Sequence, residues 1–298
     1  MDLPEILKNE LKGIKAKVPL ARYTTFRIGG PASFFYSAKS NDLLVKSIKL
    51  AIQEKVPYFL LSGGSNVLVS DTGFDGLVIK ADNQNFQFTD NTLEADSGVI
   101  LNKLVAEGTK RGLSGLEWAA GIPGTVGGAI RGNAGAKDGE MKDIVDWVEV
   151  VKEDGDTINM SSKDCQFKYR DSLFKNKDLI IISAKLNLEQ DDQQQIQQRV
   201  ASNLKNRLDT QPFQEHSAGC IFKNPEGASA GQLIDQAGLK GKKIGGAEVS
   251  DKHANFIVNT GKATAEQVVM LIGLIKQKIR NQHNIQLQEE IEYIGFDN

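Results

Sequence analysis

Apolar side chains recur at every third or fourth position in several segments of the chain, a spacing that places them on one face of a helix. The segments predicted as helices are 3–11, 41–52, 100–111, 191–208, 229–236 and 265–279. Thr264 precedes the last of these and Gln267 follows three positions later, which is the capping-box signature of a helix start. The helix at 191–208 is polar and rich in glutamine, and we expect it to connect two structural units.

Short apolar runs between glycine-rich or polar turns predict strands. These runs lie in 57–80, 85–95, 144–160, 179–188, 252–259 and 285–294. In 144–160 the turn Glu153-Asp154-Gly155 separates two runs, which indicates a hairpin. We expect 285–294 to form one continuous strand. One face of that strand is predicted to carry Leu287, Glu289, Ile291 and Tyr293.

The composition is that of an ordinary globular protein, with 40% hydrophobic and 25% charged residues among 298. The net charge is −2 and no basic run occurs, so we expect no nucleic-acid partner. Residues 1–13 contain acids and lack the apolar core of a secretory signal, and no apolar stretch reaches the roughly 18 residues of a membrane helix. A cytoplasmic location without a membrane partner is therefore expected. The sequence gives no indication of protein partners.

The chain has two cysteines, Cys165 and Cys220, at a separation that fits neither a zinc site nor a redox CxxC pair. Both are predicted to be free thiols, and either is also compatible with a small buried apolar residue. We expect no metal site.

The stretch Ala119–Ala136 (AAGIPGTVGGAIRGNAGA) contains six glycines in 18 residues and one charged side chain. This is too much glycine for an ordinary helix or strand, because glycine costs conformational entropy unless a positive φ or a close backbone approach requires it. Exposed N–H groups in a turn make an anion site without a lysine. We interpret the stretch as a nucleotide cradle; tight packing against a neighbouring element is the alternative.

A second glycine turn, Ser62-Gly63-Gly64-Ser65-Asn66, lies between two predicted strands. Its amides and the Ser65 hydroxyl suit a pyrophosphate, although a turn between strands uses glycine in any case. The spacing GxxGxxGG at 121–128 matches neither a Rossmann fingerprint nor a P-loop, so both of these folds are disfavoured. Together the two stretches suit opposite sides of one long nucleotide cofactor.

Three polar side chains are candidates for chemistry. Arg170 lies in the irregular segment YRDS, although an arginine in a loop is usually only solvated. Cys220 stands in SAGCIFKNP close to Lys223 and Asn224, and a buried structural cysteine is the alternative. Glu290 lies in LQEEIEYIG, where an exposed strand face would explain the acidic residues equally well.

These motifs occur together in a known order. FRIGGPA, SGGSNVLV, AAGIPGTVGGAIRGNAGA, YRDS, SAGCIFKNP, KHANFIVN and EEIEYIG are similar in order and spacing to those of the UDP-N-acetylenolpyruvoylglucosamine reductases, in the shorter form without an inserted tyrosine loop. The resemblance implies an α+β fold, with an FAD-binding domain of the vanillyl-alcohol-oxidase (PCMH) type in two subdomains and a C-terminal substrate domain. The expected boundaries are 1–80, 81–205 and 206–298.

The resemblance also implies a reaction. NADPH reduces FAD, and a hydride then passes to the enolpyruvyl carbon of UDP-N-acetylglucosamine enolpyruvate, giving UDP-N-acetylmuramate for peptidoglycan. By match to the motifs, Cys220 donates the proton, while Arg170 and Glu290 stabilise the enol-like carboxylate intermediate. The residues expected to contact FAD are Gly63, Gly64, Ser65, Asn66, Gly121, Gly124, Thr125, Gly127, Gly128 and Asn133. Those expected to hold the substrate are Arg207, Lys223 and Asn224.

The sequence departs from the family pattern at two positions. The proton donor is more familiar as serine, and here it is Cys220. A thiol, with a reference pKa of about 8.5, releases its proton more readily than an alcohol, so we expect the chemistry to survive with altered pH dependence and sensitivity to oxidants. Glu292 stands where many relatives carry arginine, which alters the charge near Glu290.

Two other functions fit parts of the pattern. One is an FAD-dependent oxidase of the same fold that acts on another alcohol or sugar. The lack of an obvious histidine or cysteine for covalent flavin attachment in Ala119–Ala136 argues against it. The other is a flavin- or sugar-nucleotide-binding protein without turnover.

Overall fold

The computed structural model describes residues 3–296, and the chain divides into two compact units. Unit 1 consists of Met1–Ala16, Phe34–Gly63 and Gly76–Asn206, and unit 2 of Lys17–Ser33, Gly64–Asp75 and Arg207–Asn298. Each unit combines segments that are far apart in sequence, and one crossing between units falls between Gly63 and Gly64, inside the second glycine turn. The division into 1–80, 81–205 and 206–298 stays a prediction.

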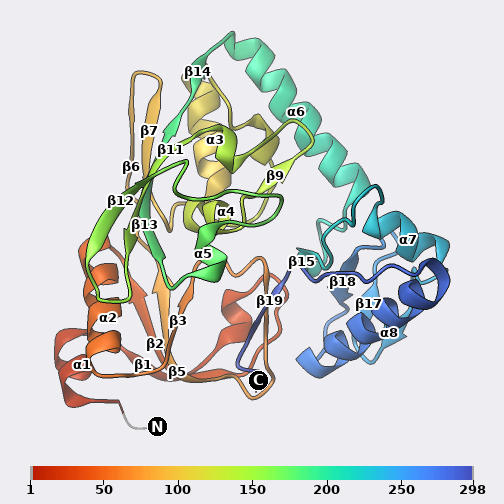
Figure 1. The fold of residues 1–298 in the computed structure, drawn as a ribbon, viewed down its shortest axis with the longest axis horizontal. Coiled ribbons are helices and arrows are strands. Elements are labelled where there is room, and N and C mark those ends of the chain that lie inside the picture. Colours follow the sequence, from red (N-terminus) through yellow and green to blue (C-terminus); the bar gives the residue numbers. More distant parts are fainter. Residues whose placement is uncertain (1–2, 297–298) are drawn as a thin grey trace. The chain divides into compact units, whose positions relative to one another are not determined.

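Helices are interspersed with runs of strands along residues 3–296 (Figure 1). The helices are α1 (Glu5–Glu10), α2 (Asn41–Gln53), α3 (Leu101–Lys110), α4 (Val126–Arg131), α5 (Leu173–Asn176), α6 (Gln193–Thr210), α7 (Ala230–Gln236) and α8 (Ala265–His283). The strands are β1 (Lys15–Pro19), β2 (Pro31–Ala38), β3 (Tyr58–Leu61), β4 (Val67–Val69), β5 (Phe74–Ala81), β6 (Phe86–Thr89), β7 (Thr92–Asp96), β8 (Leu113–Ser114), β9 (Gly135–Ala136), β10 (Gly139–Glu140), β11 (Val145–Val151), β12 (Thr157–Ser161), β13 (Ile180–Asn187), β14 (Glu189–Gln190), β15 (His216–Cys220), β16 (Lys243–Ile244), β17 (Ala247–Val249), β18 (Phe256–Asn259) and β19 (Glu292–Ile294).

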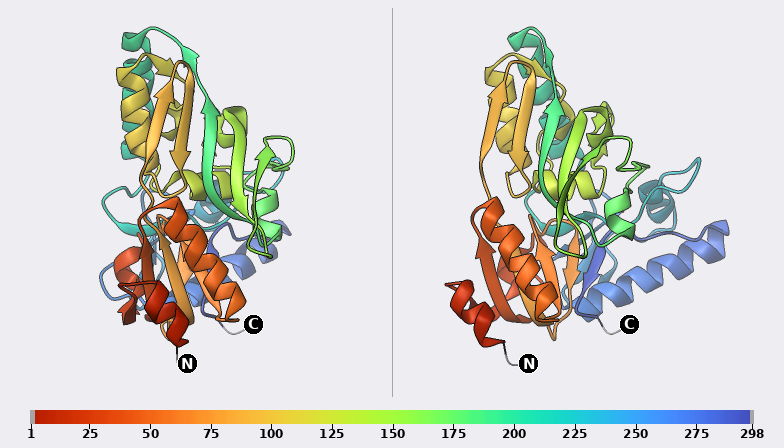
Figure 2. Two further views of the ribbon diagram at one scale, coloured as in Figure 1. Left: turned by 90° about the vertical axis from the view of Figure 1, so that its left-hand side faces the viewer. Right: turned by 60° about the vertical axis from the view of Figure 1, so that its left-hand side comes forward.

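The first sheet has the strand order β1-β2-β5-β3, with β3 and β5 parallel. Helix α2 lies against this sheet (Figure 2), and its apolar face Leu44, Ile48 and Ala51 is buried together with Leu77 of β5. The predicted one-sided helix at 41–52 is therefore confirmed. Strand β3 ends directly before the glycine turn 62–66, so this layer carries the first part of the candidate site.

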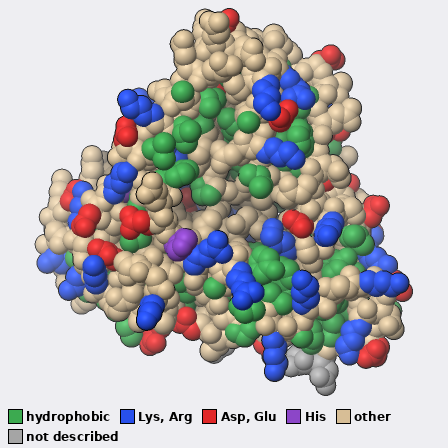
Figure 3. All heavy atoms as spheres, turned by 180° about the vertical axis from the view of Figure 1, so that it is seen from behind, with side chains coloured by type: hydrophobic (Ala, Val, Ile, Leu, Met, Phe, Trp, Pro, Cys, Tyr) green, Lys and Arg blue, Asp and Glu red, His purple; other side chains and the backbone are tan. Residues whose placement is uncertain are grey.

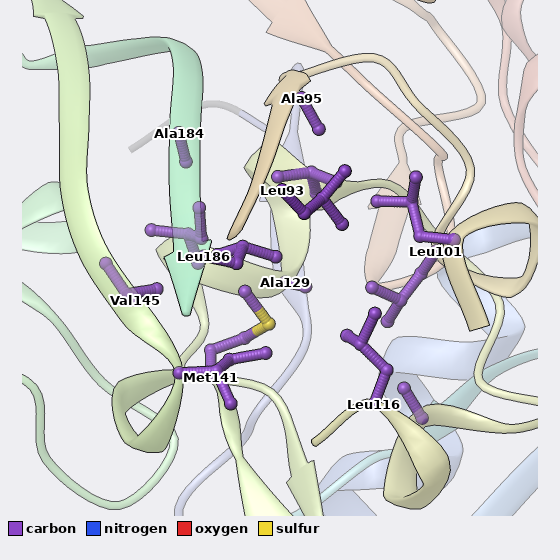
Figure 4. Close-up of a cluster of buried hydrophobic side chains, with 14 of the residues drawn as sticks. Leu93, Ala95, Leu101, Leu116, Ala129, Met141, Val145, Ala184 and Leu186 are labelled. Atoms are coloured by element: carbon purple, nitrogen blue, oxygen red, sulfur yellow. The ribbon is translucent and has the colours of Figure 1, made fainter. Parts of the chain in front are cut away.

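The second sheet, β12-β11-β13-β7-β6, is antiparallel and belongs to unit 1. Its core brings Leu93 and Leu186 from the strands together with Leu101 of α3 and Ala129 of α4 (Figure 4). Because α4 lies within the glycine-rich stretch, this apolar core holds that stretch in place.

Unit 2 contains a third antiparallel sheet, β15-β18-β17-β16, packed with α7 and α8 around a separate core. The predicted buried face of α8 is confirmed at Val268, Ile272, Ile275 and Ile279. Its predicted capping box is also present, since the Thr264 hydroxyl accepts the N–H of Gln267 while the Gln267 side chain accepts that of Thr264. Within the described residues, none of the helices has the length and apolarity needed to cross a membrane.

The hairpin of β11 and β12 confirms the turn signal at Glu153-Asp154-Gly155, whereas the C-terminal strand prediction was wrong over most of its length. Only Glu292–Ile294 form a strand, parallel to β4. Just before this strand the main chain bonds to another segment, since the Glu290 N–H donates to the Ile221 carbonyl and not to β4. Tyr293 is accordingly 37% exposed, although strict alternation predicted that it shares a face with buried residues.

Helix α6 is fastened to unit 1 by a buried carboxylate. Glu117, 8% exposed, accepts hydrogen bonds from the Gly115 N–H (2.6 Å), the Ser114 hydroxyl (2.8 Å) and the Arg199 guanidinium (2.8 Å). Burial by itself raises the pKa of Glu117, but these hydrogen bonds outweigh burial and the net pKa is lowered. The folded state therefore favours the ionised carboxylate.

Glu117→Gln is expected to lower the free energy of unfolding at neutral pH by about 2 kcal/mol, because hydrogen bonds to a charged group are replaced by weaker ones. A lowered folded-state pKa gives stability that is present above the unfolded pKa of about 4.3 and is lost as pH falls through the folded value. The difference between variant and wild type should therefore shrink in acid. Denaturant titrations at neutral and acidic pH measure it.

Glu5→Gln is the matched control, because Glu5 is 78% exposed and pairs with Lys8 on the surface of α1. Exposed pairs of this kind contribute about 0–1 kcal/mol. Equal losses in the two variants would contradict the anchoring role of Glu117.

Candidate active site

The glycine-rich stretch includes a short helix. Helix α4 begins after Thr125, whose hydroxyl accepts the Gly128 N–H at 3.5 Å, and it runs through Gly127 and Gly128. The expectation that so much glycine excludes a helix was wrong here. The reason is that Val126 and Ile130, on either side of the glycines, are fully buried and hold the helix by packing.

Four of the six glycines serve the protein's own packing or backbone. Gly121 and Gly124 have φ of +76° and +134°. A Cβ on Gly127 would lie 2.8 Å from the Ser97 Cβ, and one on Gly135 would lie 2.5 Å from a Glu140 side-chain carbon. A positive φ at Gly121 and Gly124, and tight internal packing at Gly127 and Gly135, explain these glycines without a ligand.

Gly128 is different, because neither packing nor φ requires glycine there. It is exposed, lacks a positive φ, and a Cβ on it would meet nothing closer than the Thr125 hydroxyl at 3.8 Å. Ile100, which forms an isolated bridge to Thr125, is 49% exposed beside it. Bare backbone next to an exposed apolar side chain fits a flat ligand lying on the main chain, so the residues present suit a flavin nucleotide.

The two glycine stretches meet within unit 1. A Cβ on Gly63 would lie 2.8 Å from the Gly124 Cα, and the Ser62 and Thr125 hydroxyls are hydrogen-bonded. The two stretches are therefore in contact at this point. Their placement on opposite sides of one cofactor stays a prediction.

The rest of the second glycine turn belongs to unit 2. Gly64 has φ +62°, and a Cβ on it would lie 2.0 Å from the Tyr23 carbonyl oxygen, so only glycine fits. The Asn66 Nδ2 donates to the Glu290 carbonyl at 3.0 Å, and the Asn66 main-chain carbonyl accepts the Glu292 N–H at 2.9 Å. Asn66 thus fixes the backbone around the predicted catalytic glutamate.

Cys220 and Glu290 lie on adjacent backbone segments of unit 2. Cys220 ends β15 opposite Phe256, directly after a register shift in which Gly219 adopts φ +78°. The Glu290 N–H donates to the Ile221 carbonyl at 2.7 Å. Both predicted catalytic side chains are half-buried, and the segments that carry them are joined by this main-chain hydrogen bond.

Arg170 lies at the end of the glycine-rich stretch in unit 1. It occupies a tight turn closed by Lys168 and Asp171, with φ +53°. Its Nη2 donates to the Gly135 carbonyl at 2.7 Å, and the guanidinium lies 5.3 Å from the centre of the Tyr169 ring. A guanidinium held in this way is suited to stabilise developing negative charge.

The Asn133 side chain makes its hydrogen bonds inside the protein. It is 0% exposed, and Nδ2 donates to the Glu140 carboxylate at 2.7 Å and to the Lys168 carbonyl at 2.9 Å. Its Oδ1 accepts the Lys142 N–H at 3.0 Å. These bonds tie Asn133 to the turn that carries Arg170, although the sequence suggested an FAD contact.

The predicted substrate residues have mixed surroundings. Lys223 is half-buried, and among the described residues its ammonium group has no hydrogen-bonding or ionic partner. Asn224 is exposed, but its Oδ1 accepts the Ala230 N–H at 3.0 Å and so supports the start of α7. Arg207 lies near the end of α6, 3.4 Å from the side-chain oxygen of Gln211.

Sequence reasoning missed two side chains that shape the site. Lys80 donates to the Ser62 carbonyl at 3.2 Å and supports the glycine turn, and burial lowers its pKa. It ends an apolar run, and no local pattern marks it. Ser172 donates to the Arg131 carbonyl at 2.7 Å, and its place in the YRDS motif was the available signal.

Comparisons with known proteins show which family the chain resembles. Residues 211–294 match the family description "UDP-N-acetylenolpyruvoylglucosamine reductase, C-terminal domain", and residues 32–161 match "FAD binding domain". The UDP-N-acetylenolpyruvoylglucosamine reductase of Chlamydia muridarum is 43% identical over 284 residues, covering 95% of each chain. The chain belongs to the UDP-N-acetylenolpyruvoylglucosamine reductase family.

Other members of the family are similarly close. The reductase of Clostridium botulinum (strain Alaska E43) is 39% identical over 285 residues, covering 95% of this chain and 94% of that one. The crystal structure of the UDP-N-acetylenolpyruvylglucosamine reductase from Thermus caldophilus aligns with a TM-score of 0.81 at 38% identity, covering 94% of this chain and 98% of that one.

Membership of the UDP-N-acetylenolpyruvoylglucosamine reductase family confirms several predictions made from sequence. These are the family itself, the α+β fold with an FAD-binding domain, and an FAD-containing oxidoreductase. The matches favour the reductase over the alternative of an oxidase of the same fold.

Proposed function

We propose that this chain reduces UDP-N-acetylglucosamine enolpyruvate to UDP-N-acetylmuramate, with Cys220, Arg170 and Glu290 as its catalytic residues. The observation that carries the proposal is that Cys220 and Glu290 lie on neighbouring segments, which are joined by the hydrogen bond from the Glu290 N–H to the Ile221 carbonyl. A flavin bound to the Gly63–Gly128 backbone surface supplies the relay of hydride from NADPH to the enolpyruvyl carbon. We further propose that the enzyme acts in the cytoplasm.

Cys220 supplies the proton that the reaction needs. When one carbon of the enolpyruvyl double bond receives a hydride, its neighbour must receive a proton. The Cys220 thiol gives that proton and is left as a thiolate, which water reprotonates. Its half-buried position at the end of β15 is compatible with both contact to substrate and recharging.

Arg170 and Glu290 act on the carboxylate of the substrate. Hydride addition beside a carboxylate loads negative charge onto its oxygens, and a guanidinium held in one place stabilises that charge at little reorganisation cost. Glu290 is held by main-chain bonds on both sides, through its own N–H and through the carbonyl that accepts from Asn66. The main chain at Glu290 is thereby fixed beside the segment that carries Cys220.

The UDP moiety needs positive charge to balance its diphosphate. Lys223 provides it three residues after Cys220, and Arg207 adds a second positive charge from the end of α6. The face in Figure 3 carries basic and acidic side chains interspersed, which agrees with local recognition of phosphate and with the small net charge of −2.

The visible spectrum of the purified protein tests this function. The reductase requires a yellow protein that NADPH bleaches and that regains its colour, without oxygen, when the enolpyruvyl sugar nucleotide is added. Return of colour with oxygen alone would favour an oxidase, and a protein that NADPH does not bleach would be a binding protein without turnover.

Gly128→Leu is expected to leave the fold intact but to lower the flavin bound per protein by about tenfold or more, because the side chain would occupy the exposed backbone surface. Flavin content is measured from absorbance after gel filtration, with thermal unfolding recorded in parallel. Gly273→Leu on α8 is the control, since Gly273 is also exposed with open space around it. Equal flavin content in both variants would disprove the cradle at Gly128.

A further inference from the structure

The turn that carries Arg170 is tied to one short segment, residues 131–135, at three points. The Asn133 Nδ2 donates to the Lys168 carbonyl at 2.9 Å, and the Ser172 hydroxyl donates to the Arg131 carbonyl at 2.7 Å. The third tie is the Arg170 guanidinium itself, which donates to the Gly135 carbonyl at 2.7 Å. The turn is thus held before, at and after the arginine.

The backbone of this turn needs such support. Arg170 has φ +53°, in the left-handed region that costs a non-glycine residue energy. Asn133, at the other side of the contact, has φ +41°. Arg170 and Asn133 both keep this costly left-handed conformation, which indicates that the surrounding structure enforces it. Such strained residues cluster at functional sites.

Asn133 also connects the turn at 168–172 to residues 140–142. Its Nδ2 also donates to the Glu140 carboxylate at 2.7 Å, and its Oδ1 accepts the Lys142 N–H at 3.0 Å. Glu140 takes part in a capping box with Asp143 at the start of a short 3-10 turn, and it also pairs with Lys142. Asn133 and Ser172 are 0% and 1% exposed, so neither reaches a ligand on the surface.

We propose that Asn133 and Ser172 are positioning residues, which fix the turn at 168–172 against residues 131–135 and so set where the Arg170 guanidinium meets the substrate. The proposal rests on the proposed function, because it presumes that Arg170 acts on the substrate carboxylate. It replaces the expectation that the Asn133 side chain contacts FAD. Each residue acts through Arg170 and touches no substrate atom.

A double-mutant cycle tests the proposal on the flavin-loaded full chain. Asn133→Ala is expected to slow flavin reoxidation by substrate about 10²-fold, since a misplacement of about 1 Å costs that much, while flavin reduction by NADPH is unchanged. In the Arg170→Ala background, Asn133→Ala should cost nothing further, because the guanidinium that it positions is gone. Rapid-mixing absorbance of the flavin measures both half-reactions.

Asn102→Ala is the matched control. Asn102 also binds the backbone of the glycine-rich stretch, accepting the Gly121 N–H at 2.7 Å and donating to the Ile122 carbonyl at 2.9 Å, but it makes no bond to the Arg170 turn. Whatever Asn102→Ala costs alone, that cost should add in full to Arg170→Ala. Ser172→Ala, which removes one hydroxyl, repeats the cycle if Asn133→Ala does not fold.

The outcomes separate the two proposals. If Arg170→Ala leaves reoxidation by substrate unchanged, the role of Arg170 in the proposed function fails, and the positioning role fails with it. If Arg170→Ala slows reoxidation but Asn133→Ala and Ser172→Ala add their full cost to it, only the positioning role is overturned. Loss of FAD with an equal loss of both half-reactions in Asn133→Ala would likewise overturn it, in favour of a direct cofactor contact.

Discussion

Cys220→Ala is expected to slow flavin reoxidation by the enolpyruvyl substrate by about 10² to 10⁴, the range that a positioned general acid contributes. Flavin reduction by NADPH should be unchanged, because that step transfers a hydride and needs no proton from Cys220. Rapid-mixing absorbance of the flavin, with each substrate added in turn under anaerobic conditions, resolves the two half-reactions.

The local structure explains why the loss should be confined to one step. Cys220 is the last residue of β15, and the register shift before it is a bulge, the kind of irregularity that re-aims a side chain at the end of a strand. Shortening the cysteine side chain to the methyl group of alanine removes the proton source and leaves the pairing with Phe256 of β18 in place. The backbone bond that holds Glu290 to Ile221 is likewise kept.

Two variants serve as controls. Cys220→Ser keeps a proton donor and should retain measurable turnover. Cys165→Ala removes the other thiol, which is fully buried, donates to the Ser161 carbonyl at 3.3 Å and has its pKa raised by burial to about 12. Cys165→Ala should leave both half-reactions intact, whereas a comparable loss of both half-reactions in Cys220→Ala would remove Cys220 from the role of donor.

Local signals in the sequence predicted much of this fold, because they act over a few residues. The capping box at Thr264 and Gln267, the hairpin turn around Asp154, and the buried face of α2 each depend on spacing within a single element. The glycine stretches were found in the same way, since an excess of glycine is visible without any tertiary contact.

What the sequence did not reveal depends on partners that are distant along the chain. Residues 285–294 alternate like a strand, but the segment pairs with residues near Ile221 up to Glu290 and with β4 only from Glu292. No pattern within the segment encodes that change of partner. The same holds for Asn133, whose motif suggested a ligand contact and whose bonds to Glu140 and Lys168 are tertiary.

For the glycine-rich stretch, the sequence predicted that the glycines have a role but not which role each one has. Composition indicated that its glycines have a reason, but it did not separate Gly127, packed against Ser97, from exposed Gly128. Only the three-dimensional structure distinguishes a glycine that the protein's own packing or backbone requires from one whose exposed backbone is available to a ligand. That distinction makes a Gly128 variant a sharper test of the cradle than a Gly127 variant.

Arg170→Ala is expected to slow flavin reoxidation by substrate by about 10² to 10³, the usual cost of removing one preorganised donor to a developing negative charge. The guanidinium is well suited to this role because its bond to the Gly135 carbonyl and the left-handed turn hold it in place before substrate arrives. Reduction by NADPH should be much less affected, since the charge on the substrate carboxylate develops only in the second step.

Two further variants separate geometry from net charge. Arg170→Lys keeps the charge but lacks the planar fork that meets a carboxylate with two donors, so it should recover only part of the lost rate. Lys168→Ala removes a positive charge two residues away while keeping the backbone carbonyl that Asn133 binds, and its exposed side chain makes it a fair control for charge alone. If Lys168→Ala slows reoxidation as much as Arg170→Ala does, long-range electrostatics and not a positioned guanidinium would account for the effect.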